Sequence, residues 1–471
     1  MVLPRDAEEL DPRFVRDAYG LKLSRLLFAS LVTIDPRSLE VIPDLAEEVE
    51  QLDPLTYRAV LRPQLRFADG SPLDAADVVA TFRGIVDERL GSRYAGTYAR
   101  IAHVWAESER VVRFRLDEPH ATFLTDLEMP IVREEDALRR LARPGDPEPV
   151  GAGPYRLRQR TRGHLRLEAN PYWHHGSPTH PRLRFVVVRD DNTRALRLLA
   201  GAGDVAINAI TPLLLPMFEA DERFEVRSAP GVGTTYLGFH TEALPLEVRR
   251  AIAAAIDRQG LIAAKLSGRA SRTESWIPSG HWAEITLPPR RFDPAAARRF
   301  LDAAGWVAGA DGVRGHLVLR VSSDRFRVSV ARAIAAMLRD VGLDVVVRPS
   351  DTATLLADLD AGRFDLCLLQ VPEVFEPHVL SWFFSSEHIP GEGRRGANRW
   401  RLSDPQLDAA LERGRRSFER AERRAAYATV QRRLYETLPV FPLWQEDSVA
   451  VVRRGVPLDV PRDGRLGTLA R

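Results

Sequence analysis

The stretch LRFADGSPLDAADVVATFRGIV, residues 65–86, decides the first part of the fold. Asp69-Gly70 is a turn dipeptide, and Pro72 leads into a helix. Asp74 stands at the N-cap position, with Asp77 three residues later in the place of a capping box. Apolar residues then recur at helical spacing, at Val78, Val79, Phe82, Ile85 and Val86. The stretch therefore predicts a tight turn followed by one amphipathic helix.

The segments around this turn and helix have the pattern of strands. TYRAVLRPQLRF (56–67) alternates apolar and polar residues, and VVRFRLDEP (111–119) alternates until it reaches a proline. LVTIDP and LEVIPDLAEEVE (31–50) indicate short strands and loops. Prolines and a glycine at Pro144, Gly145, Pro147 and Pro149 mark a boundary at 144–153. Residues 31–149 are thus expected to form an α+β region.

The remainder of the chain alternates between strand and helix patterns. LRFVVVRD (183–190), followed by a helix and a strand within 192–210, predicts a βαβ unit. EVRRAIAAAIDRQGLIAAKL (247–266) predicts one amphipathic helix. Residues 316–350 predict a strand–helix–strand crossover, and 407–438 are mostly helical. The chain is therefore expected to belong to the α/β class.

Composition narrows the class of protein. The 471 residues carry 67 Lys and Arg against 65 Asp and Glu, and the two signs are interspersed, which speaks against a nucleic-acid-binding stripe. Cys367 is the only cysteine, so an intramolecular disulfide is excluded, and its apolar setting predicts a buried thiol. The start, MVLPRDAEELDP, does not read as a secretion signal. The chain is therefore expected to be cytoplasmic unless an export signal was removed.

Signatures of catalysis and of cofactor binding are missing from the sequence. There is no H-E-x-x-H, G-x-S-x-G or Walker A motif. The match to G-x-G-x-x-G at residues 391–396 follows a proline rather than a strand, which favours a surface loop over a dinucleotide site. His174, His175 and His180 have no carboxylate at helical spacing beside them, which favours solvated histidines over metal ligands. We therefore predict no catalytic residue, no cofactor and no metal site.

Ten stretches along the chain have the form of motifs known from one family. They are LDP (10–12), SRLLFASL (24–31), LRPQLRFADGSPLDAADVVATF (61–82), GAGPYRL (151–157), LEANPYW (167–173), ALRLLAGAGDVAI (195–207), TTYLGFHT (234–241), EVRRAIAAAIDRQGLI (247–262), DPAAARRFLDAAGW (293–306) and LPVFPLW (438–444). Each motif is modest by itself, but their order and spacing extend over nearly the full length. Taken together, they resemble the extracellular solute-binding proteins of family 5, the peptide/nickel type of ABC importers.

The resemblance implies a periplasmic-binding-protein-like fold of class II, cluster C, with two α/β lobes and an extra N-terminal domain. Lobe I would comprise 1–30, 150–230 and 446–471, the extra domain 31–149, and lobe II 231–445. The implied function is capture of a peptide or similar solute by hinge closure, followed by delivery to an ABC permease. The implied protein is a periplasmic or extracellular monomer that is not an enzyme.

The resemblance also implies which residues contact the ligand. In peptide-binding relatives a cleft loop follows an FD-x-x-x-x-x-W strand, and an acidic residue three places later pairs with the peptide's amino terminus. FDLCLLQVPEVFEP (364–377) is similar, with Gln370 in place of the tryptophan, Glu373 as the acid and Glu376 in the later acid-Pro pair. The remaining candidates for ligand contact are Tyr236, Trp282, Asn398 and Arg399.

Two further classes of function stay open beside peptide transport. Gln370 removes an aromatic wall, so a nickel chelate, a sugar or an opine is an alternative ligand within the same fold. A cytosolic ligand-sensing domain of a regulator is the second class. An enzyme such as a metal-dependent hydrolase has no support in the sequence.

Overall fold

The computed structural model describes residues 1–141, 149–371, 373–391, 393–394 and 396–470. Pro144, Gly145 and Pro147 of the predicted boundary lie outside the described residues, as do Glu392 and Arg395 of the glycine-rich loop. The chain forms two compact units, unit 1 with residues 1–229 and 448–471, and unit 2 with residues 230–447. It therefore passes between the units at 229–230 and again at 447–448. The finer division of unit 1 into lobe I and an extra domain stays a prediction.

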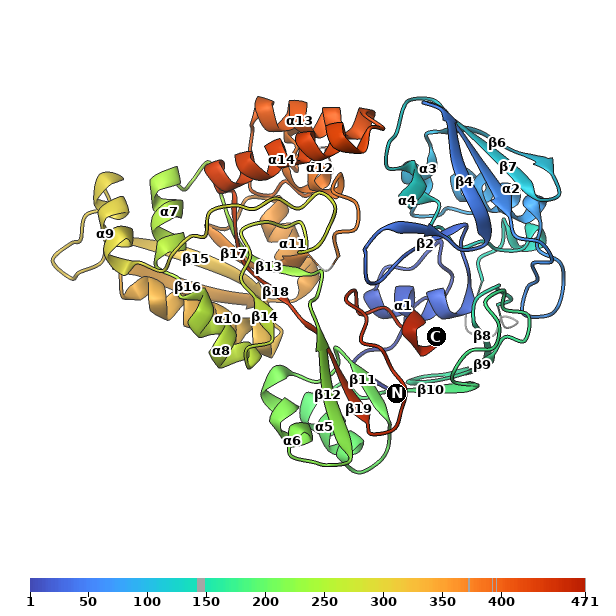
Figure 1. Cartoon of the computed structure of the whole chain (residues 1–471). Helices are drawn as coiled ribbons and strands as arrows, with labels where there is room; N and C mark the ends of the chain where they lie inside the picture. The colour runs from blue at the N-terminus through green and yellow to red at the C-terminus, as the bar shows by residue number, and fades with distance from the viewer. Residues whose placement is uncertain (142–148, 372, 392, 395, 471) are drawn as a thin grey trace. The chain divides into compact units, whose positions relative to one another are not determined.

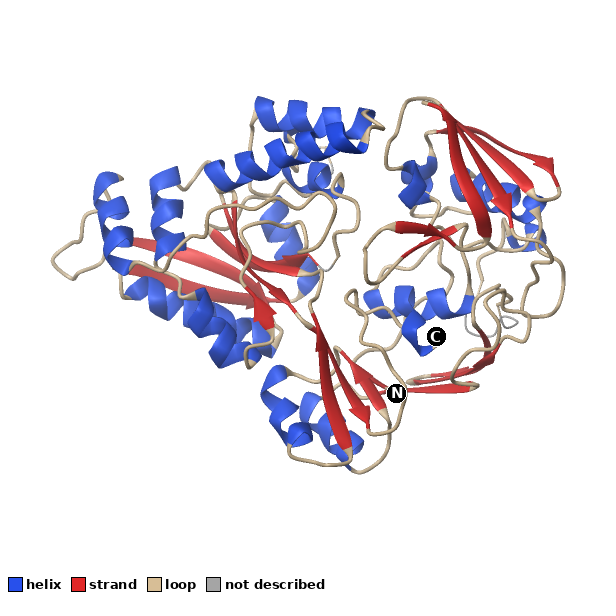
Figure 2. Ribbon diagram, viewed as in Figure 1, coloured by secondary structure: helices blue, strands red, loops and turns tan. Residues whose placement is uncertain are grey.

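The first sheet of unit 1 is antiparallel, in the order β4-β5-β7-β6 (Figures 1 and 2). Helix α2 (Ala75–Val86) packs against it, with the Phe82 ring 5.0 Å from that of Phe114 between centroids. The predicted capping box of α2 is confirmed. The Asp74 side chain accepts a hydrogen bond from the backbone N–H of Asp77, and the Asp77 side chain accepts one from the backbone N–H of Asp74. The strands are β4 (Ala46–Asp53), β5 (Thr56–Leu61), β6 (Ile101–Ser108) and β7 (Val111–Leu116).

The described residues of unit 1 form three further sheets, in the orders β1-β10-β9-β8, β11-β19-β12 and β2-β3. The strands are β1 (Val2–Leu3), β2 (Val32–Ile34), β3 (Val41–Pro43), β8 (Tyr155–Thr161), β9 (His164–Ala169), β10 (Arg182–Val187), β11 (Val205–Ile207), β12 (Phe224–Ala229) and β19 (Ser448–Arg453). The helices are α1 (Ala18–Leu27), α3 (Ala95–Tyr98), α4 (Phe123–Asp126), α5 (Asp191–Leu199) and α6 (Leu215–Glu219). Single 3₁₀ turns lie at Glu134–Asp136, Pro212–Leu214 and Gly467–Leu469.

The prediction of a βαβ unit over 183–210 is wrong. Strands β10 and β11 do form on either side of helix α5, but they belong to different sheets. β11 pairs instead with β19, with Ala206 opposite Val451. The partner comes from the far end of the chain, so the local pattern of strand, helix and strand could not reveal it.

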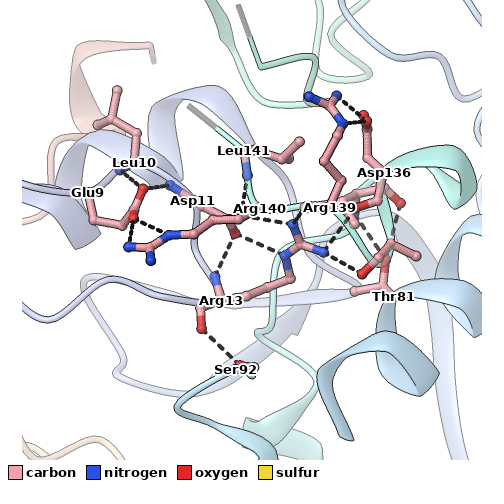
Figure 3. A network of polar contacts seen from close by, with 12 residues as sticks. Glu9, Leu10, Asp11, Arg13, Thr81, Ser92, Asp136, Arg139, Arg140 and Leu141 are labelled. Carbon is pink, nitrogen blue, oxygen red and sulfur yellow. Dashed lines mark hydrogen bonds and ion pairs between the residues drawn. The ribbon is translucent and has the colours of Figure 1, made fainter. Parts of the chain in front are cut away.

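A buried polar network closes the N-terminal segment of unit 1 onto residues 136–141 (Figure 3). The side chains of Asp11 and Arg13 are both 0% exposed, and Arg13 Nη2 donates to Asp11 Oδ2 at 2.8 Å. The Arg13 guanidinium also donates to the carbonyls of Asp136, Ala137 and Arg139. Buried charges are tolerated only when they are paired and hydrogen-bonded, and this pair satisfies both conditions.

Unit 2 is built on one six-stranded sheet, in the order β14-β18-β13-β17-β15-β16. Strands β16, β15 and β17 run parallel, which confirms the crossover predicted over 316–350. β13 pairs antiparallel with β17 and with β18. The strands are β13 (Thr234–Phe239), β14 (Ala270–Ser271), β15 (Gly315–Ser322), β16 (Leu343–Ser350), β17 (Leu366–Val371) and β18 (Val440–Glu446).

Helices cover both faces of this sheet, so its central strands are buried on both sides. One core contains side chains of α7 (Leu246–Ala254), α8 (Arg258–Leu266), α9 (Pro294–Ala303) and α10 (Arg325–Arg339). The other contains side chains of α11 (Thr352–Asp360), α12 (Val379–Phe384), α13 (Pro405–Arg416) and α14 (Arg420–Thr437). A 3₁₀ turn lies at Ser386–His388. Cys367 of β17 is fully buried, as predicted.

The prediction of one helix over 247–266 is wrong, because the chain forms two helices there. α7 ends at Ala254, and Asp257 caps α8 by accepting the backbone N–H of Gly260 at 2.9 Å. In the first turn of a helix the backbone N–H groups have no carbonyl of the preceding turn to bind. An aspartate at the N-cap accepts a hydrogen bond from one of them and so favours the start of a new helix. Within the described part of the chain, no helix has both the length and the apolar character to span a membrane.

Candidate functional site

One edge of the sheet in unit 2 collects the carboxyl ends of strands β15, β16, β17 and β18. The register sets Thr234 of β13 opposite Val371 of β17 and Gln445 of β18 at this edge. The chain also enters and leaves unit 2 here, since β13 begins at Thr234 and β18 ends at Glu446. Open α/β sheets bind ligands beyond the carboxyl ends of their strands, where the connecting loops converge. This edge is therefore the candidate binding surface of unit 2.

Hydrogen-bonded polar side chains line this edge. Arg327, in the first turn of α10, donates from Nη2 to Gln370 Oε1 at 2.6 Å. Thr235 donates to Glu446 Oε1 at 2.7 Å, and Trp444 Nε1 donates to the same oxygen at 3.2 Å. The Gln370 amide is thus oriented by a guanidinium, at the position where the resemblance implies a tryptophan in relatives.

The two predicted carboxylates after β17 differ in their surroundings. Glu376 accepts a hydrogen bond from Arg423 Nη2 at 2.5 Å, and both side chains of this ion pair are mostly buried. Glu373 is half-buried, and among the residues that the structure describes it has no ion-pair partner. A half-buried carboxylate without an internal cation is the better receptor for a cationic group of a ligand.

Trp282 contacts the same arginine that forms the ion pair with Glu376. The Arg423 guanidinium lies 5.1 Å from the centre of the Trp282 ring, and Arg420 lies 5.5 Å from it. Cations over an indole face are held by its quadrupole. Arg423 therefore connects Trp282 with Glu376, and the structure brings these two predicted residues together.

Three other predicted residues make contacts inside the packed body of unit 2. Tyr236 is 2% exposed, with its ring 4.4 Å from Trp276 and 5.5 Å from Trp400 between centroids. Asn398 is fully buried and donates from Nδ2 to three backbone carbonyls. Arg399 donates from Nε to Asp360 Oδ1 at 2.7 Å. Their contact with ligand stays a prediction, and the contacts observed are structural.

Burial governs the protonation of the groups beneath the edge. Loss of solvent raises the pKa of the Tyr236 hydroxyl well above its usual value, and it raises the pKa of the Cys367 thiol to about 12. Both groups are therefore neutral at physiological pH.

Sequence reasoning missed Arg327, Thr235 and Glu446. A signal for Arg327 was present, because it follows the strand 316–323 at the start of the predicted crossover helix. The position of such a residue is fixed by the N-cap, where Asp324 accepts the Arg327 backbone N–H at 3.0 Å. No local signal relates Thr235 to Glu446, since they are 211 residues apart in sequence.

A second cluster of ligating side chains lies in unit 1. Asp44 Oδ1 is 2.9 Å from His174 Nε2 and 2.8 Å from His175 Nε2. Burial alone would raise the pKa of Asp44, but the hydrogen bonds and charges of the two histidines bring it well below the usual range. His180 contacts the Pro457 carbonyl instead. The sequence shows no carboxylate at helical spacing from these histidines. In the structure the carboxylate is that of Asp44, which lies 130 residues before His174 in the chain.

Comparison with known proteins agrees with this architecture. The chain is 31% identical over 432 residues to Protein XP55 of Streptomyces lividans, covering 88% of this chain and 78% of the relative. Its structure superposes on NikA from Brucella suis in complex with Fe(III)-EDTA with a TM-score of 0.88, at 24% identity and 99% coverage of each chain. The oligopeptide-binding protein AppA from Bacillus subtilis, in complex with a nonapeptide, gives 0.79 at 18% identity, covering 99% of this chain and 97% of AppA.

A family model also matches most of the chain. It is that of the "Bacterial extracellular solute-binding proteins, family 5 Middle", and it matches residues 40–389. This range includes the whole first sheet of unit 1 and most of the sheet of unit 2. The chain belongs to family 5 of the bacterial extracellular solute-binding proteins.

Proposed function

We propose that the protein is the substrate-binding component of an ABC importer and that its solute is a short peptide or a similar small molecule with a free amine. The observation that carries the amine is Glu373, a half-buried carboxylate without an internal ion-pair partner in the described part of the chain. Glu373 follows β17 at the edge where parallel α/β sheets bind ligands. The two Oε atoms of an ionised glutamate accept charge-assisted hydrogen bonds from an ammonium group.

Several finer points belong to the same proposal. The protein binds and releases its solute without covalent chemistry, acts as a monomer and works outside the cytoplasm. The two chain crossings, at 229–230 and 447–448, serve as the hinge for closure. A closed form presents the solute to the permease, because a ligand favours the state for which it has the higher affinity.

A non-peptide ligand is the second candidate, and Gln370 is the observation that favours it. Peptide-binding relatives are expected to have tryptophan at this position, whereas here an amide is held by Arg327. An amide beside a guanidinium offers hydrogen bonds to hydroxyl or carboxylate groups. A sugar, an opine or a metal chelate would use this chemistry.

A thermal-shift screen distinguishes these ligands. The panel contains di- to pentapeptides, sugars, opines and nickel chelates, and a ligand present at 100 times its Kd stabilises the protein by about 2.7 kcal/mol. We expect peptides to raise the melting temperature. A shift with a sugar or chelate and none with any peptide would overturn the peptide assignment.

The Glu373→Gln variant tests the proposed amine contact. We expect it to bind free-amine peptides at least tenfold more weakly, a loss of about 1.4 kcal/mol, because an amide cannot neutralise the ammonium. N-acetylated forms of the same peptides should bind both proteins equally. Calorimetric titration measures both, and Glu387→Gln, the same change at an exposed position of unit 2, is the matched control. Equal affinity of wild type and Glu373→Gln for free-amine peptides would contradict the role of Glu373.

A further inference from the structure

A turn in unit 1 holds two neighbouring histidine rings together. Residues 173–176 form the turn, in which the Gly176 N–H donates to the Trp173 carbonyl at 2.9 Å. Gly176 has φ +93°, in the region that favours glycine. The ring centroids of His174 and His175 are 4.1 Å apart. Adjacent residues of a strand would point to opposite faces, so this turn is what brings both rings to one place.

Asp44 faces the two rings from a backbone that is fixed on both sides. It follows β3, its N–H donates to the Leu31 carbonyl at 3.0 Å, and its own carbonyl accepts from Arg62 Nε at 2.6 Å. One carboxylate oxygen, Oδ1, is within 2.9 Å of both imidazole Nε2 atoms. Three nitrogen and oxygen donors thus converge on one point, supplied by two segments that lie 130 residues apart.

The spacing of these donors fits a metal ion. Two ligand atoms on a tetrahedral zinc ion are roughly 3.3 Å apart, given metal–nitrogen distances of 2.0–2.1 Å. One ligand atom of each residue lies within 4.8 Å of the others, so small side-chain movements suffice to place an ion between them. Imidazole with carboxylate suits zinc, copper, nickel and iron, whereas magnesium and calcium prefer oxygen donors alone.

The cluster is also accessible to an ion from solution. The side chains of His174, Asp44 and His175 are 7%, 15% and 38% exposed, so the cluster is shielded on one side and open on the other. Asp44 and His175 line a pocket within unit 1. Two arginines of the same pocket, Arg25 and Arg465, are paired with Glu128, and Arg465 is also paired with Asp463, so two carboxylates offset the two positive charges. An ion held by three residues would keep its remaining coordination position toward this pocket.

We infer that Asp44, His174 and His175 form a binding site for one divalent first-row transition-metal ion. The site lies wholly in unit 1 and uses none of the residues proposed for solute binding in unit 2. Its occupation ties the segment after β3 to the turn after β9. It is therefore a second ligand site, and metal binding there does not depend on the solute proposed for unit 2.

The experiment uses the full chain, stripped with EDTA and dialysed. Zinc affinity is measured by competition with a chromophoric chelator, and Co²⁺ is added separately to record its visible absorption. We expect one zinc ion per chain at this site, and a cobalt spectrum of mixed nitrogen and oxygen ligation. Asp44→Asn and His175→Ala should each weaken zinc binding at least tenfold, since even residues that only support a ligand typically contribute 10–100-fold.

The matched control is His316→Ala. His316 Nδ1 lies 3.0 Å from Asp344 Oδ2, a histidine–aspartate pair in unit 2 that is not part of a cluster of three ligating residues in the described chain. Its loss should leave zinc affinity unchanged. Metal-free Asp44→Asn with the wild-type melting temperature shows that any loss of affinity does not come from unfolding. Zinc binding that is equal in wild type and Asp44→Asn, or no binding at millimolar zinc, would overturn the proposal.

The metal-binding experiment and the Glu373 experiment test separate proposals, and either proposal can be refuted without the other. Glu373→Gln should bind zinc as the wild type does, and Asp44→Asn should bind solute as the wild type does. A loss of both activities in either variant would indicate a damaged fold, which the melting temperature detects.

Discussion

Replacing Arg13 by alanine is expected to cost about 3–5 kcal/mol of unfolding free energy, because it leaves a buried carboxylate without its cation. Asp11 is fully buried, and Arg13 is its ion-pair partner (Figure 3). The same guanidinium donates to the carbonyls of Asp136, Ala137 and Arg139, and these hydrogen bonds would be lost as well. Urea denaturation followed by circular dichroism measures the loss. A domain has only about 5–15 kcal/mol in total, so unit 1 would be close to unfolding.

Arg89→Ala is a closely matched control. Arg89 also follows its aspartate by two residues, and its backbone N–H and guanidinium both bind Asp87, as Arg13 binds Asp11. The Arg89 side chain, however, is 75% exposed. Exposed ion pairs contribute little because water solvates each partner separately. We expect the urea midpoint of Arg89→Ala to match the wild type, and an equal midpoint for Arg13→Ala would refute the importance of burial.

Replacing Trp400 by alanine is expected to destabilise unit 2 by about 3–5 kcal/mol, since a large buried aromatic side chain is removed and a cavity is left. Trp400 is 0% exposed, and its Nε1 donates to the Phe383 carbonyl at 3.0 Å. The indole lies directly over Gly238, where an added Cβ would come within 2.1 Å of Trp400 Cζ3. Gly238 is thus a glycine of close approach, and both residues are needed for the packing between β13 and the segment after α12.

Trp382→Ala provides the same change at a position that is 43% exposed in the same unit. We expect its urea midpoint to stay near that of the wild type. Hydrogen exchange adds a local measurement, since the amides of β13 and β17 should lose protection in Trp400→Ala alone. Protection and midpoint unchanged in Trp400→Ala would show that the cavity is filled by neighbouring side chains.

The local elements of this protein were largely predictable from its sequence. The capping box at Asp74 and Asp77 and the crossover over 316–350 depend on residues close together in the chain, and both are confirmed. The family was predictable for a related reason, because its motifs keep their order and spacing along the chain, and the family model confirms it. The break between α7 and α8 was not seen, although Asp257 carried the capping signal.

The candidate site was predictable only in part. Glu373 was predicted from the resemblance to the family, and the structure adds that no described residue forms an ion pair with it. Arg327 was missed because its partner, Gln370, lies 43 residues away and is reached only when β15 and β17 pair. Tyr236 and Asn398 were predicted to contact the ligand. In the structure Tyr236 is buried against Trp276, and Asn398 donates hydrogen bonds to three backbone carbonyls.

The sequence by itself determined most of the strand and helix patterns, the class of fold and the family, because these depend on local periodicity and on motif order. Only the tertiary structure decided that β11 pairs with β19, that Arg13 neutralises Asp11 out of water, and that Asp44 meets the histidine pair. Each of these depends on contacts between segments far apart in the chain or on removal from solvent. Such contacts leave no mark in a local stretch of sequence, since the free energy that selects them arises when the whole unit packs.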